Sequence, residues 1–121
     1  MFVNLSNHPS KEWSQAQLLA AEEVGGEVMD VPFPDISPAA SLDEVRLQAR
    51  GLASRIMELH PVAAMVHGEP VLVCQTVRLM EAAGIRCYAA TTRRIVTEEK
   101  AGEGVTRKTS HFEFVQFRPY Q

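Results

Sequence analysis

The sequence has few of the residues that mark several protein classes. It contains only two cysteines, Cys74 and Cys87, whose spacing matches neither a metal motif nor a secreted disulfide scaffold. No apolar run approaches the roughly 18 residues that a membrane span needs, and the first residues do not resemble a signal peptide. We therefore expect a cytoplasmic protein with two free, buried thiols and no contact with a membrane.

An excess of basic charge is also missing. The 12 basic and 15 acidic residues give a net charge of −3, which argues against a broad basic face for long nucleic acid. A small anionic ligand is compatible with this balance because it needs only a local region of positive potential. The apolar fraction of 45% over 121 residues is typical of one globular domain.

The common catalytic motifs are absent as well. There is no Walker loop, no GxGxxG after the first predicted strand, no nucleophile elbow and no HExxH, which argues against nucleoside triphosphatase and dinucleotide chemistry. Asp30 and Asp35 flank the end of the second predicted strand, but no acidic pair follows the first strand to complete a phosphoacceptor site. We expect neither a metal site nor a cofactor.

Alternating helix and strand signals predict an α/β fold. Capping-box patterns at Ser14 and Ser41 predict two helix starts, and a proline at position 70 in the first turn is typical of a third. The helices are predicted to end at Gly25-Gly26, at His60-Pro61 and at Gly84. Strands are predicted over residues 2–6, 27–31, 62–68 and 85–90.

The C-terminal segment has a different pattern. Phe112 and Phe114 alternate with Glu113, and two extended runs flank a glycine turn at 101–104, which predicts an antiparallel hairpin. The whole order predicts a single Rossmann-like domain over 1–121, with a mostly parallel sheet and helices on both faces. Its βα core would span 1–92 and the hairpin 93–121.

Polar residues follow each predicted parallel strand. These segments are "SNHP" (6–9), "PFPD" (32–35), "HGEP" (67–70) and "TTRR" (91–94). A parallel sheet binds ligands beyond the carboxyl ends of its strands, so several of these segments should meet at one edge. This convergence is the main functional signal of the sequence.

Segment 91–94 is suited to phosphate. Arg93 and Arg94 carry forked, permanently charged donors, and Thr91 and Thr92 add hydroxyl groups. In the alternative interpretation, Arg93 or Arg94 simply begins the hairpin and pairs with a carboxylate such as Glu98.

The helix start at 67–70 is a second candidate. Backbone N–H groups after Gly68 would favour an anion at the helix N-terminus, while the Glu69 carboxylate would compete with it or orient a ribose hydroxyl or a water. Alternatively, Glu69 is only a favourable charge in the first turn. His67 either faces the ligand or is a satisfied histidine at the end of a strand.

His8 is the candidate for proton transfer. Histidine is suited to general acid or base work near neutral pH, and it can also hydrogen-bond a ligand. The structural alternative is that residues 7–9 shape a turn, with Ser6 or Asn7 bonding the local backbone.

Four stretches of the sequence resemble a known family. "FVNLSNHPSKEWSQAQ", "DVPFP", "HGEP" and "AATTRRIV" look like segments of the small stand-alone CRISPR-associated proteins found near type III loci, which have a CARF-like, Rossmann-like fold. The resemblance covers residues 2–118. It implies a cyclic oligoadenylate ligand and a homodimer that binds this two-fold symmetric ligand across its interface. Several such proteins are ring nucleases, in which a ribose 2′-hydroxyl attacks the adjacent phosphate without a metal.

The resemblance also implies roles for particular residues. It places Ser6, Asn7 and His8 in the ligand-contacting loop after the first strand, and residues 91–94 in a second such loop after the fourth. His8 and Arg93 would then be catalytic, and the ligand would be bound by Ser6, Asn7, His67, Gly68, Glu69, Thr91, Thr92 and Arg94.

One departure and two alternatives accompany this assignment. Pro70-Val71 stand where the family has a threonine soon after the glutamate, which puts a role for that helix start in doubt. The alternative functions are a non-catalytic nucleotide-binding or adaptor module, and a nucleoside-processing enzyme that uses Glu69 as its nucleophile.

Overall fold

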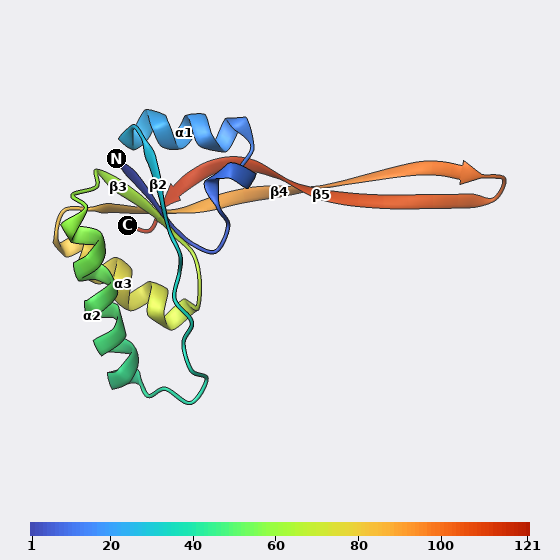
Figure 1. The fold of residues 1–121 in the computed structure, drawn as a ribbon. Coiled ribbons are helices and arrows are strands. Elements are labelled where there is room, and N and C mark those ends of the chain that lie inside the picture. The colour runs from blue at the N-terminus through green and yellow to red at the C-terminus, as the bar shows by residue number, and fades with distance from the viewer.

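The computed structural model describes residues 1–121, which form one five-stranded sheet flanked by helices (Figure 1). The elements are β1 (Phe2–Leu5), a 3₁₀ turn η1 (Ser10–Glu12), α1 (Gln15–Gly25), β2 (Val28–Val31), α2 (Leu42–Glu58), β3 (Ala63–Val66), α3 (Pro70–Ala82), β4 (Arg86–Gly102) and β5 (Val105–Pro119). The strand order is β2-β1-β3-β4-β5, with parallel pairing from β2 to β4 and antiparallel pairing between β4 and β5. The predicted Rossmann-like α/β class is confirmed.

The helices begin where their capping residues predict. The Ser14 hydroxyl accepts a hydrogen bond from the Gln17 N–H at 3.2 Å, and the Ser41 hydroxyl accepts one from the Glu44 N–H at 3.2 Å. Each bond satisfies one of the N–H groups that the first helical turn leaves unpaired. α1 ends at Gly25, and the C-cap residue Gly26 has a φ of 81°, in the left-handed region that glycine adopts without strain.

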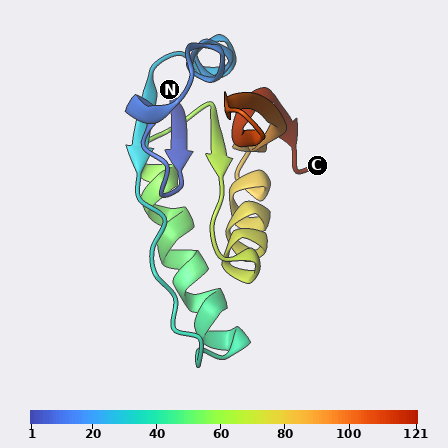
Figure 2. The same ribbon diagram turned by 90° about the vertical axis from the view of Figure 1, so that its right-hand side faces the viewer.

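The sheet separates two hydrophobic layers. α1 covers one face, and α2 and α3 cover the other (Figure 2). All four residues of β1 are buried, and they alternate between the layers: Val3 and Leu5 pack against the α2 and α3 side, while Phe2 packs with Ala21 of α1. Burial of side chains of this size stabilises the fold by about 1.5–3 kcal/mol each.

Segment 91–94 is strand and not a polar corner, so the prediction of a loop after the fourth strand was wrong. β4 pairs with β3 only from Arg86 to Tyr88, then continues through this segment as the partner of β5 as far as Gly102. The predicted fourth strand and the first strand of the predicted hairpin are one element. The glycine turn is confirmed, because Glu103 and Gly104 connect β4 to β5.

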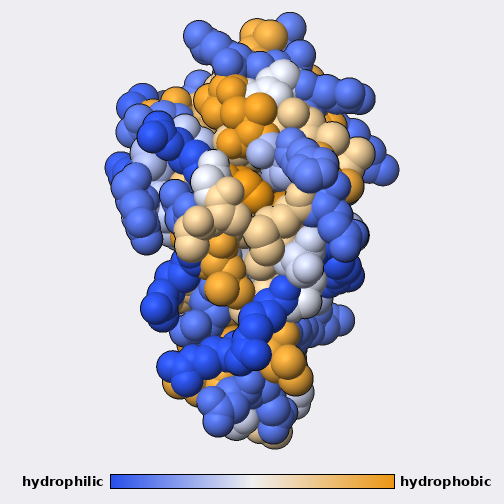
Figure 3. All heavy atoms as spheres, turned by 90° about the vertical axis from the view of Figure 1, so that its left-hand side faces the viewer, coloured by the Kyte–Doolittle hydropathy of each residue, from blue (hydrophilic) through white to orange (hydrophobic).

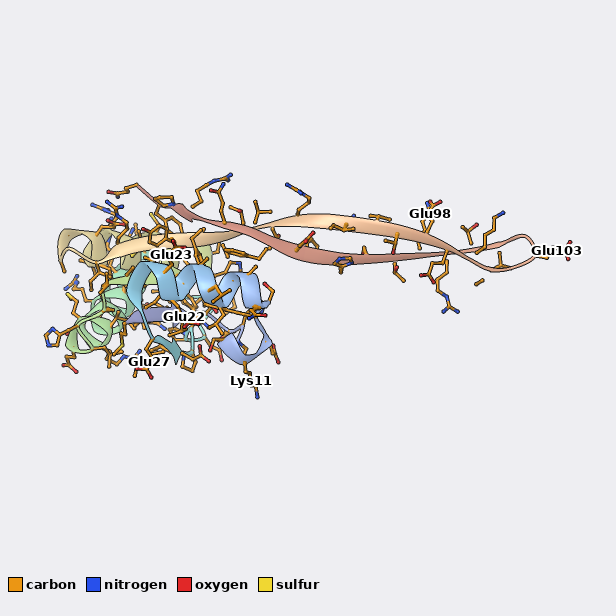
Figure 4. The ribbon with its side chains drawn as sticks, turned by 90° about the horizontal axis from the view of Figure 1, so that it is seen from above. Lys11, Glu22, Glu23, Glu27, Glu98 and Glu103 are labelled. Atoms are coloured by element: carbon orange, nitrogen blue, oxygen red, sulfur yellow. The ribbon has the colours of Figure 1, made fainter.

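Beyond the body of the molecule, β4 and β5 form a long two-stranded ribbon, here called the arm (residues 92–116) (Figure 1). Of its side chains only Ile95 and Phe114 are partly buried. Glu98 lies along the arm and Glu103 at its tip, both far from Glu22, Glu23 and Glu27 of the body (Figure 4). No helix covers the outer part of the arm.

The two cysteines differ in their surroundings. Both are free thiols, but Cys87 is buried in the core whereas Cys74 is exposed on α3, so the prediction of two buried thiols was wrong for Cys74. Cys74 follows buried Val73 and lies on the outer side of α3, where it faces solvent.

None of the helices combines the length and apolar composition that a membrane span requires. At the end of the body opposite the arm, hydrophilic side chains surround a strip of hydrophobic atoms (Figure 3).

Candidate functional site

A buried polar network shapes the loop after β1. Asn4 is fully buried, and its amide nitrogen donates to the His8 carbonyl at 2.8 Å and to the Asp30 carboxylate at 3.0 Å. The Ser6 hydroxyl donates to the Asn4 side-chain oxygen at 2.6 Å and accepts from the His8 N–H at 3.1 Å. Ser6 is therefore turned inward to hold the loop, as the structural interpretation proposed.

Asp30 and Trp13 complete this network. Both carboxylate oxygens of Asp30 accept from the Ser10 N–H, at 3.2 and 3.1 Å, which ties the end of β2 to η1. The indole N–H of Trp13 donates to the His8 carbonyl at 3.2 Å. The backbone of His8 is thus fixed from several sides, while the side chains of Asn7 and His8 remain exposed.

His67 lies beside His8 at the reversal point of the strand order. The chain leaves β1 towards β2 on one side and leaves β3 towards β4 on the other, which is where parallel sheets bind ligands. The His67 N–H donates to the Leu5 carbonyl at 3.1 Å, so the two strand ends are held together. The ring centroids of His8 and His67 are 5.7 Å apart.

These two rings open onto a cavity of about 450 Å³. Its lining comes from the β1 loop, α1, β3, β4 and β5, and comprises His8, Trp13, Gln17, Met65, His67, Ala90, Thr92 and Phe112. The volume is within the range of pockets that bind small ligands. Trp13 and Phe112 give the cavity an aromatic lining that suits a nucleobase.

The four residues of segment 91–94 do not share one site. Because β4 is a strand, its side chains alternate, so Thr92 and Arg94 lie on the cavity face while Thr91 and Arg93 lie on the other. Arg93 is paired across the ribbon with Glu113, and the Thr91 hydroxyl donates to the Gln116 carbonyl at 3.1 Å. Arg94 lies further along the arm than Thr92 and is exposed.

Glu69 caps the helix that follows it. Its carboxylate oxygens accept from the N–H groups of Val71 at 3.1 Å and Leu72 at 2.7 Å, so they occupy donors that an external phosphate would use. Glycine is needed at position 68 for packing, because a Cβ there would lie 2.2 Å from the buried ring of Phe33. This arrangement gives Gly68 and Glu69 roles in the fold.

Sequence reasoning missed several residues of the site. Asn4 could have been recognised from the sequence, because a polar residue inside a buried strand needs hydrogen-bond partners. In the structure Asp30 supplies one of these partners from the neighbouring strand. The sequence pattern indicates only a strand at Phe112 and a helix start at Trp13. No three histidine, cysteine or acidic side chains lie close enough together to hold a metal ion.

The chain was compared with known proteins. A family model described as "Uncharacterized protein MJ1673 family" matches residues 1–118. The chain belongs to this family. Comparisons with curated proteins and with solved structures gave no match. The assignment of this MJ1673 family member to a function therefore depends on the chemistry of its own residues.

Proposed function

We propose that the protein binds a cyclic oligoadenylate and cleaves it, as a cytoplasmic ring nuclease of type III CRISPR defence. The observation that carries the proposal is the pair of histidines 5.7 Å apart at the strand-order reversal, opening onto a cavity with aromatic lining. The resemblance of the strand-end segments to small CRISPR-associated proteins supplies the ligand class. A homodimer follows from the symmetry of such a ligand.

The cavity suits one adenylate unit of the ring. An adenine base can stack on Trp13 or Phe112, a contact that contributes about 1–3 kcal/mol per base. The Gln17 amide has only the thioether of Met65 as a side-chain partner, at 3.6 Å, and can hydrogen-bond the base edge. The Arg94 guanidinium, on the same face as Thr92, supplies charge for a phosphate.

The proposed reaction needs only proton transfer and positioning. The ribose 2′-oxygen attacks the adjacent phosphorus while the bond from phosphorus to the 5′-oxygen breaks, leaving a 2′,3′-cyclic phosphate and a 5′-hydroxyl. One histidine of the pair takes the 2′-hydroxyl proton, and the other gives a proton to the departing 5′-oxygen. Arg93, expected to be catalytic, lies on the face of β4 away from the cavity, so His67 is the better partner for His8.

One observation favours the binding-only alternative. Neither imidazole of the pair has a hydrogen bond to another protein group that would orient it for proton transfer. A nucleotide-sequestering or adaptor module would use the same cavity without turnover. The third function, nucleoside processing by Glu69, is disfavoured because that carboxylate caps α3.

The test is incubation of the purified protein with cyclic tetra-adenylate in EDTA, followed by chromatography of the products. A linear product ending in a 2′,3′-cyclic phosphate supports the ring nuclease. Tight binding with an intact ring supports the sequestering module instead. An intact ring without measurable binding would rule out both.

A further inference from the structure

The outer edge of β5 is a long unpaired backbone surface outside the candidate site, and the outer edge of β4 is also unpaired beyond Tyr88. β5 ends the strand order of the sheet, so the far side of Val105–Pro119 has no strand partner. A long exposed edge is a template for pairing with another strand, and an isolated two-stranded ribbon is only marginally stable in water. A strand partner would therefore stabilise the arm.

The charges of the arm indicate the class of partner. It carries five basic and four acidic side chains, namely Arg93, Arg94, Lys100, Arg107 and Lys108 with Glu98, Glu99, Glu103 and Glu113. A nearly neutral ribbon is poorly suited to a nucleic-acid backbone, which selects strongly for positive charge. Interspersed charges of both signs are instead suited to a strand with the same pattern.

We infer that β5 pairs antiparallel with β5 of a second copy of the chain, about a two-fold axis through Ser110. A two-fold axis perpendicular to the plane of the ribbon leaves each side chain on the same face of the ribbon in both copies. A residue of one copy then lies opposite the residue of the second copy that is equally far from Ser110 on its other side. Such a contact uses the same surface on both copies and closes after two chains. This inference does not rest on the proposed catalytic function.

Among the neighbouring registers of β5, charge complementarity favours this one. Within one chain, Glu99 is the cross-strand partner of Arg107, and Arg93 is the partner of Glu113. With the axis at Ser110, Arg107 lies opposite Glu113 of the second copy. The four paired strands then carry one row of charges that alternate in sign: Glu99 and Arg107 of one copy, followed by Glu113 and Arg93 of the second copy. The two-fold axis produces a second, identical row.

Neighbouring registers lose this pairing. With the axis at His111, Arg107 lies opposite Val115, and with the axis at Thr109 it lies opposite His111. Glu113 would then face Thr109 or Val105, respectively. Of these three axes, only the one at Ser110 places both Arg107 and Glu113 opposite a residue of opposite charge.

The other face of the ribbon connects the pairing to the candidate site. Phe112 is 70% exposed and lines the cavity beside Thr92. In the proposed register Lys108 of the second copy lies opposite Phe112. Its side chain covers part of the ring and brings the ammonium, which is ion-paired with Glu98 of its own chain at 3.5 Å, to the rim of the cavity. The second copy thus contributes a residue to the site.

The shape of the chain permits this arrangement. The arm extends away from the body, with Glu103 at its tip (Figures 1 and 4). Because the paired strands run antiparallel, the two bodies lie at opposite ends of the shared ribbon.

Cysteine cross-linking tests the register directly. In a Cys74→Ser background, Ser110→Cys places two thiols opposite each other across the axis, where Cβ atoms are about 4.5–5.5 Å apart and can form a disulfide after small adjustments. The matched control is Thr106→Cys, which is equally part of the exposed arm but lies about 27 Å along the strand from its own copy. We expect a covalent dimer on a non-reducing gel for Ser110→Cys alone. Equal cross-linking of both variants, or of neither, would overturn the inference.

Charge reversal provides a second measurement. Glu113→Arg should weaken the dimer about tenfold in sedimentation equilibrium, because two like-charge contacts replace two attractive ones. Adding Arg107→Glu should restore part of the lost affinity, and circular dichroism checks that each variant folds. A wild-type chain that stays monomeric at the highest attainable concentration contradicts the proposal and leaves another macromolecule as the arm's partner.

Discussion

The imidazole rings of His8 and His67 lie 5.7 Å apart at the ends of two neighbouring parallel strands. The relationship follows from the pairing of β1 with β3, in which Leu5 is the partner of Val66. Because the strand order reverses here, no crossover helix covers the strand ends, and both rings reach the same cavity. In the proposed ring nuclease, the two imidazoles would act as the proton-transfer groups at one phosphodiester.

Removal of either histidine tests this role. His8→Ala and His67→Ala should each lower the rate of cyclic tetra-adenylate cleavage by about 10²–10⁴-fold, which is the usual contribution of a general acid or base. Affinity for the ring should change much less, because stacking and charge contacts remain. Single-turnover kinetics and titration calorimetry measure the two quantities separately.

The matched control for this prediction is His60→Asn. His60 lies outside the cavity at a φ of 52°, a conformation that asparagine also tolerates, so this variant should keep both fold and rate. Cleavage that survives in both His8→Ala and His67→Ala would refute the acid and base assignment.

Asn4→Asp should destabilise the protein in a pH-dependent way. The new carboxyl group would lie beside the Asp30 carboxylate, which now accepts from Asn4 at 3.0 Å. Two like charges in a buried site raise the pKa of one of them, so the penalty is present at neutral pH and fades as acid protonates it. Urea unfolding should show a loss of about 1–3 kcal/mol at neutral pH, with a smaller loss near pH 4. Exposed Asn7→Asp, the control, should show neither effect.

Glu69→Ala should lower the free energy of unfolding by about 0.5–2 kcal/mol, because two backbone N–H groups of α3 lose their acceptor. Glu69→Asp should recover much of this loss. Exposed Glu23→Ala on α1 is the control and should have almost no effect. Thermal unfolding measures the stability, and an assay on simple nucleosides tests the alternative function. Unchanged stability with a loss of nucleoside hydrolysis would favour Glu69 as a nucleophile.

Gly68→Ala should destabilise by about 1–3 kcal/mol, because the added methyl group overlaps the ring of Phe33, which is only 4% exposed and cannot move freely. Gly51→Ala is the opposite case. Gly51 lies inside α2 with open space around its Cβ position, so alanine should stabilise by about 0.5–1 kcal/mol. Chemical denaturation of the two variants should therefore give opposite signs.

The buried thiol of Cys87 should make the protein sensitive to alkali. Desolvation by burial, followed by the nearby Glu81 carboxylate, raises the pKa of Cys87 from 9.0 to about 12. The folded thiol keeps a proton that the unfolded thiol releases, so its contribution is complete below pH 9 and is lost as the pH rises towards 12. Cys87→Ala should show a shallower loss of stability across that interval. A slope equal to that of the wild type would contradict the assignment.

Local signals accounted for the helices and for most strands. Ser14, Ser41 and the glycine turns act within a few residues, so their effects could be predicted from the sequence. The path of β4 could not, because it depends on β5 replacing β3 as the partner after Tyr88. That continuation places Arg93 and Arg94 on opposite faces, whereas a loop would have allowed them to converge.

The buried polar network was also beyond local reasoning. Asn4 finds Asp30 only because β1 and β2 are adjacent with these two residues in register. Parallel sheets bind ligands beyond the carboxyl ends of their strands, and this rule predicted that His8, His67 and Thr92 would lie close together. These three residues line one cavity.

The central claim is that the nucleotide occupies the cavity between His8 and His67, and imidazole NMR tests it most directly. Cyclic tetra-adenylate is titrated into the protein while the resonances of all four histidines are followed, with His8→Ala and His67→Ala providing the assignments. Our account predicts saturable shifts for His8 and His67, with His60 unchanged as an internal reference. Unshifted His8 and His67 resonances at saturating nucleotide would contradict it.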